Sequence, residues 1–74
     1  MYIVTILIDG RQYEPEVFDS RLEAVKYVYA DIAMALDIMF KEAKKDYPLK
    51  DNGVYYFDSN SNVEVSYAIW KAKK

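Results

Sequence analysis

The stretch YVYADIAMALDIMF, residues 27–40, decides how this chain folds, because every side chain in it except Asp31 and Asp37 is apolar or aromatic. On a helical wheel most of these side chains fall on one stripe, together with apolar residues on either side of the stretch. We expect that stripe to cover a β-sheet. Its members are Leu22, Val25, Tyr29, Ile32, Leu36, Met39 and Ala43.

The limits of this helix follow from its flanking residues. The pattern SRLE at residues 20–23 matches a capping box, in which the Ser hydroxyl and the Glu carboxylate each satisfy a free backbone amide. Pro48 disfavours helical backbone at the residue before it. We therefore predict one helix over residues 20–46, which at 1.5 Å per residue is roughly 39 Å long.

A second apolar seam lies opposite the sheet-covering stripe of the predicted helix. Tyr27, Met34 and Ile38 share it with Asp31. One interpretation is that scattered apolar residues on a polar face are ordinary. The other is that three of them within three turns mark a contact with a partner protein or with a second copy.

Four strands are predicted around the helix. Residues 2–8 are apolar and β-branched, and Asp9-Gly10 after them is a strong hairpin signal. A second strand follows to residue 18, at an edge or with a bulge because it contains Pro15. The remaining two strands are residues 54–58 and 63–72.

The order ββαββ predicts an α+β fold in one domain, residues 1–74: a two-layer sandwich with one long helix on a four-stranded, mainly antiparallel sheet. This layout is similar to the β-grasp fold, which implies the sheet order two-one-four-three with strands one and four central and parallel. The chain ends in KAKK and lacks the Gly-Gly end of conjugated proteins of that fold, so no conjugating role is expected.

The composition argues against catalysis. The chain has no His and no Cys, so the usual general base, the thiolate nucleophile, disulfides and structural zinc are not expected. Residues 58–62 begin like a calcium loop, but Val63 and Ile69 stand where that loop requires Gly and Glu. We expect no enzyme, no cofactor and no metal, and a hairpin turn at residues 58–62.

The first ten residues have neither the length nor the charge of a signal peptide or a membrane span. We therefore expect a cytoplasmic protein that does not enter a membrane.

The last strand predicts an open sheet face. Its apolar residues at positions 63, 65, 67 and 69 form the better core set, which places Trp70 on the opposite face. Tyr55 and Phe57, or else Tyr56, join Trp70 there. Tyr and Trp anchor protein interfaces at low entropy cost, although aromatic residues also pack on sheet faces without a partner.

These observations favour a small non-enzymatic protein-interaction module, homodimeric through the helix seam or the Trp70 face. In type, though not in sequence, the chain resembles small phage-encoded inhibitors such as anti-CRISPR proteins. That resemblance implies a host nucleic-acid-processing protein as partner. An acidic edge would then face its basic groove through Asp9, Glu14, Glu16 and Asp19.

The alternative hypothesis is nucleic-acid binding by the second half of the chain, where Lys outnumbers acidic residues. Tyr47 or Trp70 would serve as a stacking platform on an open sheet. The pI near 5.0 argues against this hypothesis. The lysines concerned are Lys41, Lys44, Lys45, Lys50, Lys71, Lys73 and Lys74.

Overall fold

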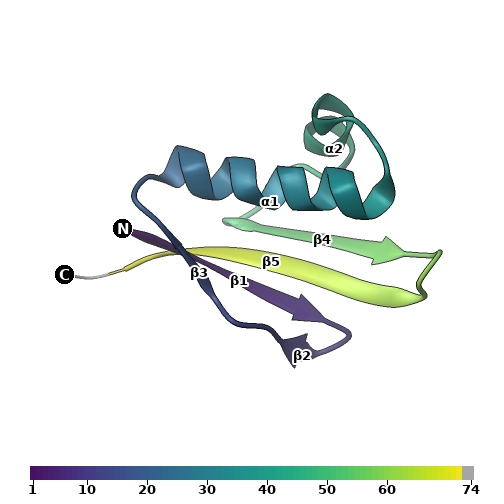
Figure 1. The fold of residues 1–74 in the computed structure, drawn as a ribbon, viewed down its shortest axis with the longest axis horizontal. Helices are drawn as coiled ribbons and strands as arrows, with labels where there is room; N and C mark the ends of the chain where they lie inside the picture. Colours follow the sequence, from purple (N-terminus) through teal and green to yellow (C-terminus); the bar gives the residue numbers. More distant parts are fainter. Residues whose placement is uncertain (73–74) are drawn as a thin grey trace.

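The computed structural model describes residues 1–72, which form one antiparallel sheet with two helices on one of its faces (Figure 1). The α+β class and the helix-on-sheet arrangement are as predicted. In chain order the elements are β1 (Tyr2–Ile8), β2 (Arg11–Gln12), β3 (Glu16–Phe18), α1 (Arg21–Leu36), α2 (Phe40–Asp46), β4 (Gly53–Asp58) and β5 (Val63–Lys71).

The single long helix predicted over residues 20–46 is wrong. Helix α1 ends at Leu36, and Asp37 takes the left-handed conformation (φ 55°, ψ 47°), from which its N–H bonds the Ala33 carbonyl. The Ile38 N–H donates to the same carbonyl at 3.0 Å. Asp tolerates this conformation better than most residues do. The chain therefore leaves α1 by a tight turn.

Helix α2 folds back over the end of α1 after this turn (Figure 1). The Glu42 carboxylate accepts the Met39 N–H at 3.1 Å, which stabilises the new helix start. Ala43 is fully buried, and the Phe40 ring lies edge-on to the Tyr29 ring with centroids 6.3 Å apart. Met39 is exposed, and so is Leu22 in the first turn of α1, so both predictions of a core position are wrong.

The sheet order is β4-β5-β1, with β2 and β3 both paired to the other side of β1. This matches the predicted order, but the parallel central pair is wrong, because β1 and β5 are antiparallel, with Tyr2 opposite Lys71 and Ile8 opposite Val65. The helix break supplies the reason. After α2, the loop of residues 47–52 carries the chain back toward the start of α1, so β4 runs in the same direction as β1 and β5 returns against it (Figure 1).

The predicted second strand is interrupted around Pro15. Four residue steps separate Gln12 from Glu16, while their partners Leu7 and Val4 are three steps apart. One extra residue is therefore accommodated between β2 and β3, which confirms the predicted bulge.

Of two further local predictions, the Asp9-Gly10 turn is confirmed, and the capping box at residues 20–23 is confirmed for its Ser20 bond. Asp9 (φ 56°) and Gly10 (φ 82°) form the β1–β2 turn in left-handed conformations. The Ser20 hydroxyl accepts the Glu23 N–H at 3.2 Å at the start of α1.

The core lies between the helices and the inner face of the sheet. Its fully buried side chains come from both layers, and Ile32, Val4 and Val28 are the largest of them. No helix within residues 1–72 is long and apolar enough to span a bilayer.

Candidate protein-binding surface

One face of the sheet carries no helix or loop of the described chain (Figure 1). We call it the open face. Strand alternation and cross-strand register assign its side chains. They are Ile3, Thr5, Leu7, Gln12, Val17, Tyr55, Phe57, Glu64, Ser66, Ala68 and Trp70.

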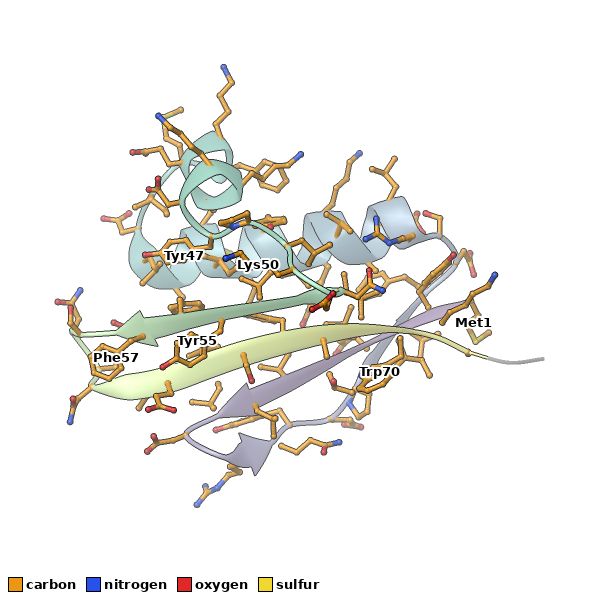
Figure 2. The ribbon with its side chains drawn as sticks, turned by 180° about the vertical axis from the view of Figure 1, so that it is seen from behind. Met1, Tyr47, Lys50, Tyr55, Phe57 and Trp70 are labelled. Carbon is orange, nitrogen blue, oxygen red and sulfur yellow. The ribbon has the colours of Figure 1, made fainter. Side chains whose placement is uncertain are left out.

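Residues of neighbouring strands meet in rows across the open face. Val17, Ile3 and Trp70 form a row at one end, where Ile3 faces Val17 on β3 and Trp70 on β5. Tyr55 lies opposite Ser66 farther along, and Phe57 lies opposite Glu64 at the other end. Aromatic side chains therefore stand at both ends of the face, as Figure 2 shows.

Trp70 is 58% exposed and held in place by one hydrogen bond. Its indole Nε1–H donates to the Thr5 hydroxyl at 3.0 Å, across to β1. Since this polar group already has a partner, the exposed part of Trp70 offers mainly apolar ring surface. The predicted location of Trp70 on the open face is confirmed.

Tyr55 and Phe57 are exposed on the open face, whereas Tyr56 is buried beneath the helices. This decides between the two alternatives for β4. Val65, Tyr67 and Ile69 of β5 are buried on the inner side, as predicted.

Val17 was missed by the sequence analysis. An unbroken β2–β3 strand in the register of Leu7 with Gln12 would set Val17 opposite Tyr2, on the inner face. The extra residue near Pro15 shifts Val17 opposite Ile3, so its side chain reaches the open face. The bulge that Pro15 predicted was the available signal.

The open face is almost free of charge. Glu64 is the one charged residue among its eleven members. Five of the remaining members are large apolar side chains that stay exposed: Leu7, Val17, Tyr55, Phe57 and Trp70.

The helix residues predicted as a second seam do not form one exposed surface. Tyr27 packs its ring on Phe18 with centroids 5.0 Å apart, and Ile38 lies in the turn after α1 against the core. Met34 remains 82% exposed by itself. The helix break separates Ile38 from the line of the other two.

Asp31, which belongs to the same predicted seam, makes a hydrogen bond inside the molecule. Its carboxylate accepts a hydrogen bond from the Tyr67 hydroxyl. Burial, and then this carboxylate, raise the pKa of the Tyr67 phenol. Asp31 therefore fixes α1 to β5, which explains its place among apolar residues.

The predicted acidic edge lies on the segment between β1 and α1. Its members Asp9, Glu14, Glu16 and Asp19 are all exposed. The segment borders the sheet on the side away from β4. The four carboxylates thus follow one edge, and Glu64 is the one charged side chain among those assigned to the open face.

Comparison with protein-family models, with curated proteins and with solved structures finds no match for this chain.

The described lysines lie away from the open face. Lys41, Lys44 and Lys45 are on α2, where the Lys44 ammonium lies 5.8 Å from the centre of the Phe40 ring. Lys50 is in the loop before β4, and Lys71 sits at an inward position of β5, opposite Tyr2. Lys73 and Lys74 lie outside the described residues.

Within residues 1–72 no three acidic side chains gather in a way that would hold a metal ion. The segment once compared with a calcium loop forms the β4–β5 turn, in which the Asp58 carboxylate accepts the backbone N–H groups of Asn60 and Ser61 at 3.0 and 3.3 Å. A hollow of about 470 Å³ beside β4 is lined by side chains that include Tyr47, Lys50 and Tyr55 (Figure 2).

Proposed function

We propose that this chain is a small non-enzymatic protein-interaction module that docks on its partner through the open face. The observation that carries the proposal is the gathering of five exposed large apolar side chains on one sheet face. Soluble monomers rarely leave so many large apolar side chains uncovered on one face unless it has a binding role.

The composition of the face supports a protein partner. Trp and Tyr are the side chains that most often dominate binding energy, and the Trp70 ring is already oriented by Thr5 before binding. Low charge in the centre with polar groups around it is the usual anatomy of a protein interface. The acidic edge supplies such a polar border on one side.

The kind of action that we propose is inhibition by occupancy of a host nucleic-acid-processing protein. The open face would provide the affinity. The carboxylates of Asp9, Glu14, Glu16 and Asp19 would sit against a basic groove, because complementary charge guides association and fixes orientation.

The second candidate is single-stranded nucleic-acid binding. Its support is the exposed rings of Tyr55, Phe57 and Trp70 on an open sheet, on which bases stack in other sheet-based binders. Against it, the open face carries Glu64 and no Lys or Arg among residues 1–72. The described part of the face thus offers phosphates no cation beside these rings, so we rank this function second.

A capture experiment with matched variants tests the proposed function. Trp70→Ser removes the largest anchor of the open face, and Met34→Ser removes a comparably exposed apolar side chain from α1. We expect immobilised wild type to retain a protein from host lysate, Trp70→Ser to retain it about 10-fold less well or worse, and Met34→Ser to match the wild type. Circular dichroism checks that both variants fold.

The result against the proposal is equal retention by Trp70→Ser, or no retained protein with the wild type. Salt-dependent binding of a labelled oligonucleotide that Trp70→Ser abolishes would favour the second candidate instead.

A further inference from the structure

Strand β4 is a free edge of the sheet, since it pairs with β5 alone. Both backbone groups of Gly53 point away from β5, because they bond Lys50 at 2.8 and 2.9 Å. The Asn52 carbonyl points toward β5 and accepts the Ile69 N–H at 2.8 Å. Antiparallel strands alternate inward and outward groups. The N–H and C=O groups of Tyr55 and Phe57 therefore point outward, and no other strand of the described chain pairs with them.

This edge lacks the usual protection against pairing. Residues 53–57, GVYYF, contain no charge and no proline. The opposite edge carries the bulge at Pro15 with Glu14 and Glu16 beside it, features that block strand addition. The edge formed by β2 and β3 is thus protected against strand addition, whereas the β4 edge is not.

We propose that β4 pairs in antiparallel fashion with β4 of a second copy of this chain. The two-fold axis would pass beside Tyr56, so that Tyr55 of each copy faces Phe57 of the other. The outward groups of these two residues then form four backbone hydrogen bonds across the axis. The two sheets become one continuous sheet.

The length of the free edge supports this register. The bridge between Lys50 and Gly53 occupies the outward backbone groups of Gly53. The unpaired part of the β4 edge therefore runs from Val54 to Asp58, with Tyr56 at its centre. In the proposed register the partner residue that would face Gly53 is Ser59, where the chain has already left the strand for its turn. Pairing would therefore end at the same point in both copies.

The side chains are also compatible with a second copy. Tyr55 and Phe57 of opposite copies would lie side by side on the open face as two cross-strand aromatic pairs, which are favourable neighbours in sheets. Residues 54–57 bring no charge to the contact, and the Asp58 carboxylate is buried and bonded to the backbone of its own turn, so repulsion between two identical edges is small.

This inference goes beyond the proposed function and does not depend on it. Edge pairing leaves Trp70 and the rest of the open face uncovered and joins two open faces into one surface. A chain that dimerises but captures no partner would contradict only the proposed function, and a monomer that captures one would contradict only this inference.

Sedimentation equilibrium over a range of concentrations tests the pairing. Wild type should rise from 8.7 kDa toward twice that mass. Phe57→Pro removes an outward N–H and adds bulk at the edge while leaving the β4–β5 hydrogen bonds intact, so we expect dimerisation to weaken about 100-fold. Phe57→Leu, which keeps the N–H, and Trp70→Ser, which alters only the open face, should still dimerise.

Hydrogen exchange on the wild type makes the test independent of how Phe57→Pro folds. The amides of Tyr55 and Phe57 should become protected as concentration rises. A wild type that stays monomeric, with both amides exchanging freely at millimolar concentration, would overturn the proposal. The β4 edge would then be available for pairing with an extended peptide of another protein instead. A dimer that Trp70→Ser abolishes and Phe57→Pro does not would overturn it in favour of contact through the open face.

Discussion

Ile32→Ala is expected to lower the free energy of unfolding by about 2–5 kcal/mol. Ile32 is the largest fully buried side chain and lies on the inward side of α1. Truncation removes apolar contacts and leaves a cavity that two rigid layers cannot fill. Because a domain of this size has a total stability of roughly 4–11 kcal/mol, the variant should lose a large share of it.

Met34→Ala is the matched control for this prediction. It lies two residues farther along the same helix and is 82% exposed, so its change should stay within about 0.5 kcal/mol. Urea unfolding followed by circular dichroism measures both variants. Similar losses for the two would mean that α1 presents a different face to the sheet.

Raising the pH above 10 is expected to destabilise the fold steeply. Burial, and then the Asp31 carboxylate, raise the pKa of Tyr67 above its ordinary value of 10.0. The folded state therefore holds a proton that the unfolded state releases near pH 10. The contribution is complete below pH 10 and is lost as pH rises, at about 1.4 kcal/mol per pH unit for this one group. Burial raises the pKa values of Tyr27, Tyr29 and Tyr56 in the same direction.

Tyr67→Phe isolates the contribution of this one tyrosine. The variant has no proton to lose at that site, so stability should fall less steeply above pH 10 than in the wild type. At neutral pH it should be less stable by about 1.5–3 kcal/mol, because the hydrogen bond to the Asp31 carboxylate is gone. Urea unfolding at a series of alkaline pH values measures both effects. An unchanged pH dependence would contradict the assignment to Tyr67.

Local signals in the sequence predicted the strands and the start of the first helix. The Asp9-Gly10 turn, the Ser20 cap and the bulge near Pro15 each depend on a residue and its immediate neighbours. The inward side of β5 was also predictable, because strand alternation with Val65 and Tyr67 in the core leaves Trp70 outside.

The helix break at Asp37 was not predictable from the apolar pattern, which continues through Phe40 without interruption. The position of the helix break depends on tertiary packing. A helix of roughly 39 Å exceeds the length of the strands beneath it, and folding back lets Ala43 bury its side chain and sets the Phe40 ring against Tyr29 within the same molecule. The direction of β4, and with it the antiparallel pairing of β1 with β5, depends on this turn.

The high Tyr count was a weaker sign of binding than expected. Tyr29, Tyr56 and Tyr67 are buried, and the Tyr56 ring lies 5.7 Å from Tyr47 and 6.3 Å from Tyr67, centre to centre. These residues build the core between helices and sheet. Among the predicted binding residues, Trp70 and Tyr55 lie on the open face, whereas Tyr27, Asp31 and Ile38 pack within the molecule.

Acrylamide quenching of tryptophan fluorescence in the free protein tests most directly whether the open face is uncovered, since Trp70 is the one tryptophan in the chain. We predict emission typical of an indole in contact with water and efficient quenching, both unchanged when the protein dimerises. Emission typical of a buried indole, with little quenching in dilute solution, would mean that the chain itself covers this face, and the docking surface described above would not exist.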